Sequence, residues 1–160
     1  MERICGGCTL CCKVLEIPEL GKPINVWCPF CDIGRGCKIY PSRPQSCKKF
    51  LCGWLQDPII PESLRPDQCG VVIEKLPGYS VHLALMDPIR PTAWMGPEIR
   101  SVLDAYVKTG IAILVGTGKG KPDEMLIPQG RMAADVMNDV RMFAIKSLKG
   151  NRNWPPRPMT

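Results

Sequence analysis

Residues 5–12 read CGGCTLCC, and this stretch decides how the N-terminal part of the chain can fold. It contains two overlapping Cys-x2-Cys units, in which successive thiols can converge on one centre. The Gly6-Gly7 pair permits the tight backbone that such a loop requires. A third unit, CPFC, follows at residues 28–31. The spacing therefore predicts loops that present several sulfur atoms to a shared ligand.

The cysteines divide the 160-residue chain into two parts. Residues 5–52 hold all but one of the ten cysteines, Cys69 is isolated, and residues 70–160 contain none. The first part is rich in loops and poor in apolar residues, so it needs a cross-link or a metal in order to fold. The candidate metal ligands are Cys5, Cys8, Cys11, Cys12, Cys28, Cys31, Cys37, Cys47 and Cys52.

The cellular compartment bears on the chemistry of these thiols. The N-terminus lacks the apolar core of a signal peptide, and no segment reaches the roughly 18 apolar residues needed to span a membrane. We therefore expect a cytoplasmic protein without membrane contact, in a reducing compartment where structural disulfides are rare. A thioredoxin-like redox motif is disfavoured because no βαβ pattern surrounds either Cys-x2-Cys site. Metal binding is favoured over a disulfide framework.

The sequence leaves the metal open. A Cys-x2-Cys-x2-Cys run is typical of bacterial ferredoxin-type clusters, whose fourth ligand can lie elsewhere in the chain. The isolated pair at residues 28–31 is more typical of a zinc knuckle. His82 is the only histidine and lies in a predicted strand, so either site must be all-thiolate. The cofactor is then one or two zinc ions or an iron–sulfur cluster, and the partition of cysteines stays undefined, although adjacent Cys11 and Cys12 are expected to point apart.

A second stretch carries a family resemblance. Residues 36–50 read GCKIYPSRPQSCKKF. Together with residues 5–12 they resemble the CxxCxxCC family of zinc- or iron-chelating proteins (YkgJ-like cysteine cluster proteins). That family typically shows C-x-I-Y-x-x-R-P-x-x-C-R-x-F, and Lys48 here replaces the second arginine. The resemblance covers about a third of the chain and implies metal chelation through Cys5, Cys8, Cys11, Cys12, Cys37 and Cys47.

The resemblance says little about biochemical role, so three hypotheses stand. The first is a metal-binding protein that chelates zinc or an iron–sulfur cluster, and whether it catalyses a reaction is left open. The second is an iron–sulfur redox enzyme or electron carrier. The third is a zinc-knuckle module that binds nucleic acid or protein through Arg43, Lys48, Lys49 and the basic tail from Arg152 to Arg157. The formal charge of +6 invites the nucleic-acid form. Thiolate ligands would offset much of that charge, so a metal ion is the expected partner, nucleic acid is disfavoured and a protein partner is left open.

A helix predicted over residues 42–56 carries two of the candidate ligands. Capping-box spacing marks its start, and Cys47 lies on its apolar stripe. Cys52 is roughly 140° around a continuous helix from Cys47. The two would then serve different sites, unless the helix ends before Cys52. Arg43, at the start, could donate hydrogen bonds to cluster sulfurs or to backbone carbonyls.

The remainder predicts an α+β fold. A loop-rich cysteine lobe, residues 1–69, is expected to pack on a lobe of residues 70–149 with a short antiparallel sheet and two or three helices, followed by an irregular tail, residues 150–160. The predicted elements of the second lobe are a hairpin of residues 71–76 and 79–86, a helix over 97–108, paired strands at 111–115 and 124–127, and a helix over 131–148.

Overall fold

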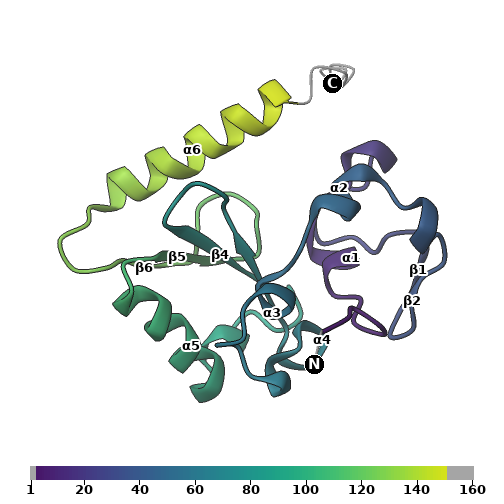
Figure 1. Ribbon diagram of the computed structural model, residues 1–160, viewed down its shortest axis with the longest axis horizontal. Helices are drawn as coiled ribbons and strands as arrows, with labels where there is room; N and C mark the ends of the chain where they lie inside the picture. Colours follow the sequence, from purple (N-terminus) through teal and green to yellow (C-terminus); the bar gives the residue numbers. More distant parts are fainter. Residues whose placement is uncertain (1–2, 151–160) are drawn as a thin grey trace.

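The computed structural model describes residues 3–150 and confirms the α+β class (Figure 1). The cysteine-rich loops form one side of the molecule, and a four-stranded sheet flanked by helices forms the other. The cysteine-rich part contains α1 (Cys11–Val14), η1 (Pro18–Leu20), β1 (Cys31–Asp32), β2 (Gly36–Cys37), η2 (Tyr40–Ser42) and α2 (Gln45–Lys49). The remaining elements are α3 (Gly53–Gln56), η3 (Glu62–Leu64), α4 (Pro66–Cys69), β3 (Val71–Lys75), β4 (Val81–Met86), η4 (Ala93–Met95), α5 (Pro97–Lys108), β5 (Ala112–Gly116), β6 (Glu124–Leu126) and α6 (Ala133–Gly150).

The sheet is mixed, whereas an antiparallel sheet was predicted. Its strand order is β3-β4-β5-β6. The predicted hairpin is confirmed as β3–β4, and the second predicted pair as β5–β6. β4 and β5 run parallel because α5 lies between them in the chain and returns it to the same end of the sheet, as parallel neighbours require.

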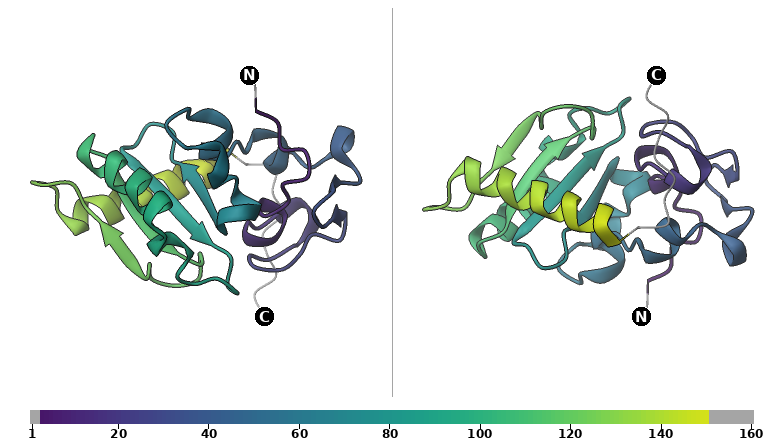
Figure 2. Two further views of the ribbon diagram at one scale, coloured as in Figure 1. Left: turned by 90° about the horizontal axis from the view of Figure 1, so that it is seen from below. Right: turned by 90° about the horizontal axis from the view of Figure 1, so that it is seen from above.

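The two long helices cover opposite faces of the sheet, and the two views of Figure 2 show one in front of the strands and the other behind. α5 begins at Pro97 and ends at Lys108, as predicted, and packs its apolar stripe against one face. α6 covers part of the other face through Val136, Val140 and Phe143. A further part of that second face, towards the cysteine-rich loops, faces the cavity described below.

The helix predicted over residues 42–56 is wrong as one continuous element. The chain leaves helical geometry at Phe50 and resumes it only after Cys52, whose backbone is extended. Gly53 begins α3 close against β3, where a Cβ atom would lie 3.0 Å from the Ile73 side chain. Packing on the sheet therefore sets the direction of α3, so that Cys47 lies in α2 and Cys52 in the extended segment before α3.

The two parts share a hydrophobic core. Leu10 and Val14, at α1, belong to the same buried cluster as Trp54, Ile60 and Leu64, which lie against the sheet. No helix within residues 3–150 is long and apolar enough to cross a membrane. The predicted irregular tail, residues 150–160, lies outside the described residues except for Gly150, which ends α6.

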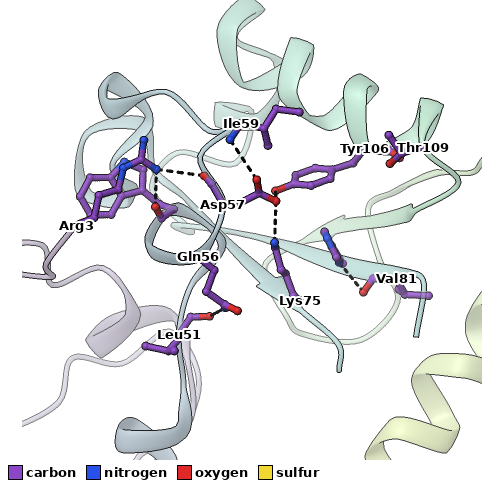
Figure 3. A network of polar contacts seen from close by, with 11 residues as sticks. Arg3, Leu51, Gln56, Asp57, Ile59, Lys75, Val81, Tyr106 and Thr109 are labelled. Atoms are coloured by element: carbon purple, nitrogen blue, oxygen red, sulfur yellow. Dashed lines mark hydrogen bonds and ion pairs between the residues drawn. The ribbon is translucent and has the colours of Figure 1, made fainter. Parts of the chain in front are cut away.

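A polar network joins α3, β3 and α5 on the face of the sheet that α5 covers (Figure 3). The carboxylate of Asp57 accepts hydrogen bonds from Lys75 Nζ at 2.7 Å and from the Tyr106 hydroxyl at 2.8 Å. Arg3 donates to the backbone carbonyls of Trp54 and Ile60 at 2.6 and 2.7 Å. Burial raises the pKa of Asp57, but the hydrogen bonds from Lys75 and Tyr106 outweigh it and the net shift is downward.

Asp57→Asn is expected to lower the free energy of unfolding by about 2 kcal/mol at pH 7, because Lys75 loses its counter-charge in a half-buried site. The folded pKa of Asp57 is depressed, so its contribution is present above the unfolded pKa of about 3.9 and is lost as pH falls through the folded pKa. Urea titrations should show a constant difference from wild type between pH 5 and 8 that shrinks below about pH 4. Asp104→Asn, in a half-exposed pair with Arg100, is the control and should cost at most about 0.5 kcal/mol.

Candidate metal centre

Both separated Cys-x2-Cys units fold as hydrogen-bonded turns. The amide of Cys8 donates to the carbonyl of Cys5 at 2.8 Å, and the amide of Cys31 donates to that of Cys28 at 3.0 Å. Gly6 supplies the positive φ of 50° within the first turn, a conformation that glycine adopts without strain. Each turn brings the backbone of its two cysteines together, which is the local geometry that a chelating loop needs.

The N-terminal loop docks on the β1–β2 hairpin. Cys31 and Cys37 are direct partners across that hairpin. The hydroxyl of Thr9 accepts a hydrogen bond from the Gly34 amide at 3.1 Å, and Gly7 lies so close that a Cβ atom would stand 2.6 Å from the Gly34 carbonyl oxygen. The hairpin cysteines are thereby held beside those of residues 5–12.

Gly7→Ala should test this docking, because the new methyl group would meet backbone rather than a flexible side chain. We expect a loss of about 1–3 kcal/mol in the free energy of unfolding, as in other overpacked sites. Gly96→Ala is the matched control, since its Cβ would make only ordinary contacts, the shortest at 3.4 Å. Equal denaturation midpoints for the two variants would contradict the close packing of Gly7 on Gly34.

Most of the candidate cysteines surround one cavity of about 960 Å³. Cys31 is not among its lining residues, but its thiol is close enough to Cys12 for each to shift the pKa of the other. Cys52 is buried in the shared core and Cys69 contacts the carbonyls of Leu64 and Val71. The cysteines that line the cavity are Cys5, Cys8, Cys11, Cys12, Cys28, Cys37 and Cys47.

Cys12 lies near several of the other cysteines. The Cys11 and Cys31 thiols are close enough to shift its pKa, and its charge would also be felt at Cys5 and Cys47. Within residues 3–150, however, no group of three or more histidine, cysteine, aspartate or glutamate side chains is arranged so that it could hold a metal ion.

The electrostatics of the site favour the protonated form of several of its thiols. Burial raises the pKa of Cys8 to about 11 and, with the neighbouring Cys12, that of Cys31 to about 12. The neighbouring Cys11 thiol, followed by burial, raises the pKa of Cys12. These three cysteines are therefore expected to become thiolates only where a cation displaces their protons. All ten cysteines are free thiols, and sulfur donors of this kind suit zinc or iron–sulfur centres.

Lys22 supplies a buried positive charge that the sequence did not predict. Only 5% of the residue is exposed. Its ammonium donates to the carbonyls of Lys13, Leu15 and Pro23, and it lies near the thiols of the cavity. Burial lowers the pKa of Lys22, while nearby thiols oppose the shift. The carbonyls hold this charge in place, where it can compensate anionic sulfur.

Two other side chains resolve alternatives left by the sequence. Arg43 caps a carbonyl: its guanidinium donates to Tyr40 O at 3.1 Å and lies 3.9 Å from the centre of the Tyr40 ring. His82 is buried beside Tyr106, on the face of the sheet that α5 covers, and its Nδ1 is 2.9 Å from the Val81 carbonyl oxygen. Histidine therefore does not reach the cysteine cavity, and the donors there are sulfur.

Comparison of the chain with protein-family models, with curated proteins and with solved structures gives no match.

Proposed function

We propose that this protein binds a metal, as zinc or an iron–sulfur cluster, through the thiolates of its N-terminal part. The observation that carries the proposal is the gathering of seven cysteines, from loops far apart in sequence, around one cavity. Folded Cys-x2-Cys turns and the fixed charge of Lys22 support it. Cys31 joins as a candidate because it lies near Cys12. Free thiols throughout the chain suit a reducing, cytoplasmic location.

The chain's own residues would do three things at such a centre. The cysteines would give up their thiol protons and become ligands, so that loading releases protons. Lys22 would offset part of the resulting negative charge without needing a water shell. The loop docking at Gly7 and Gly34 would hold the two chelating turns side by side. A bound zinc ion would supply structural cross-linking, and an iron–sulfur cluster would add one-electron chemistry.

Metal analysis of anaerobically purified protein, combined with its visible spectrum, tests the proposal. Colourless protein with one or two zinc ions per chain and no iron would establish zinc. Brown protein with iron, acid-labile sulfide and broad absorption near about 400 nm would establish a cluster. Less than about a tenth of an equivalent of zinc and iron, after growth with both metals and after in vitro reconstitution, would overturn the proposal.

An iron–sulfur redox role is the second candidate. It is favoured by the position of the cysteines on the wall of a large cavity, where a second molecule could approach them. It predicts a reversible redox couple in the loaded protein. Zinc as the sole bound metal would exclude this role and leave the chelating function intact.

A further inference from the structure

The cavity beside the cysteines extends well beyond them. Its opposite wall is the face of the sheet formed by Glu74 on β3 and by Leu83 and Leu85 on β4. Phe143 of α6 also borders it. The volume of about 960 Å³ lies at the upper end of pockets that hold small organic molecules. Zinc–sulfur bonds are only about 2.3 Å long, so a metal at the thiols would leave most of this space open.

Glu74 is the one carboxyl on the sheet wall. It lies directly opposite Leu83 in the strand register, so both side chains project from the same face. Burial raises the pKa of Glu74, and no hydrogen bond or ion pair from another described residue acts on it. The side chain is half-buried and lines the cavity, so its carboxyl is open to a molecule bound there. The wall therefore presents a carboxyl with no partner among the described residues, beside the apolar side chains of Leu83 and Leu85.

Three cationic residues line the cavity; one of them, Lys49, is exposed and lies near the Glu19 carboxylate, and the other two are engaged elsewhere. Lys75 is directed to the opposite face of the sheet, where its ammonium is 2.7 Å from Asp57. Arg43 is stacked on Tyr40 on the cysteine-rich side. The sheet wall thus favours a positively charged group at Glu74, and Leu83 and Leu85 favour an apolar one next to it.

We propose that this cavity binds an amphiphilic cation: a molecule whose apolar body packs on Leu83 and Leu85 and whose protonated amine donates to the Glu74 carboxylate. The interaction goes beyond metal binding and does not require it, because Glu74 and the two leucines lie on the sheet. The bound molecule would have a defined orientation, with its amine at Glu74 and its apolar chain along β4.

Displacement of the neutral fluorescent dye Nile red tests the proposal with three probes of equal chain length: decylamine, decanol and decanoate, all below their micelle-forming concentrations. At pH 7.5 the amine is protonated and decanoate is ionised. For wild type we expect decylamine to displace the dye at a concentration about tenfold lower than decanol and lower still than decanoate. Metal content is measured on the same samples, with and without chelator, so that failure of metal binding is distinguishable from failure of this site.

Glu74→Gln should remove the preference for decylamine over decanol, because it deletes the charge and keeps the shape. The matched control is Glu98→Gln. Glu98 is exposed on α5, so this substitution makes the same change of charge on the opposite side of the sheet from the cavity. Circular dichroism and melting curves check that both variants fold. Absence of saturable dye binding to wild type, equal displacement by the three probes, a preference for decanoate, or an amine preference that survives in Glu74→Gln would each overturn the proposal.

Discussion

Cys12→Ser is expected to reduce the metal content of the purified protein from at least one equivalent to near zero and to lower its free energy of unfolding by at least about 4 kcal/mol. A loss of about 4 kcal/mol equals the stabilisation that a bound metal supplies when its free concentration is about 1,000 times its dissociation constant. We expect this effect because the Cys12 thiol lies on the wall of the cavity, near Cys11 and Cys31. A serine hydroxyl is a poor replacement for a thiolate at a thiophilic metal.

Cys69→Ser is the matched control for this change. The Cys69 thiol lies 3.4 Å from the carbonyl oxygens of Leu64 and Val71, and a hydroxyl can donate to the same acceptors. The metal content of Cys69→Ser should equal that of wild type, and its free energy of unfolding should change by about 1 kcal/mol. After chelation, Cys12→Ser and wild type should unfold at the same urea concentration. Full metal content in Cys12→Ser would remove Cys12 from the ligand set.

Local signals in the sequence were sufficient where short-range chemistry decides the structure. The α5 helix has Pro97 in its first turn, Gly110 just past its end and one apolar stripe, and all three agree on the same boundaries. The β3–β4 hairpin follows from two apolar runs around Pro77-Gly78. Both elements would be recognisable in any globular context.

Other features depend on contacts between distant parts of the chain. The apolar stripe that predicted one helix over residues 42–56 is real, but Gly53 packs on Ile73 and redirects the backbone. No sequence pattern near Lys22 predicts that its ammonium will bind three carbonyls and lie near several thiols. Its role arises from loops that meet only in the folded protein. The nine candidate cysteines could be named from spacing, but their relative positions could not.

The second large effect is expected at the ion pair that joins the two parts of the molecule. Lys13, on α1, lies 2.6 Å from the carboxylate of Asp87, just beyond β4, and only about a tenth of each side chain is exposed. Lys13→Met should lower the free energy of unfolding by about 3–5 kcal/mol, because it leaves the Asp87 charge buried without its partner. Urea denaturation of the purified protein measures the loss.

The double variant Lys13→Met/Asp87→Asn separates loss of the pair from a buried charge left alone. An asparagine oxygen can still accept the hydrogen bond that the Ile89 amide donates to Asp87 at 3.1 Å, so most of the stability should return. Arg35→Met, in an exposed pair with Asp32 at 4.0 Å, should change stability by less than about 0.5 kcal/mol. Equal effects of Lys13→Met and Arg35→Met would show that the pair does not couple α1 to the sheet.

Because α1 also carries Cys11 and Cys12, the single variant Lys13→Met should in addition bind metal more weakly. The double variant should recover that binding together with its stability.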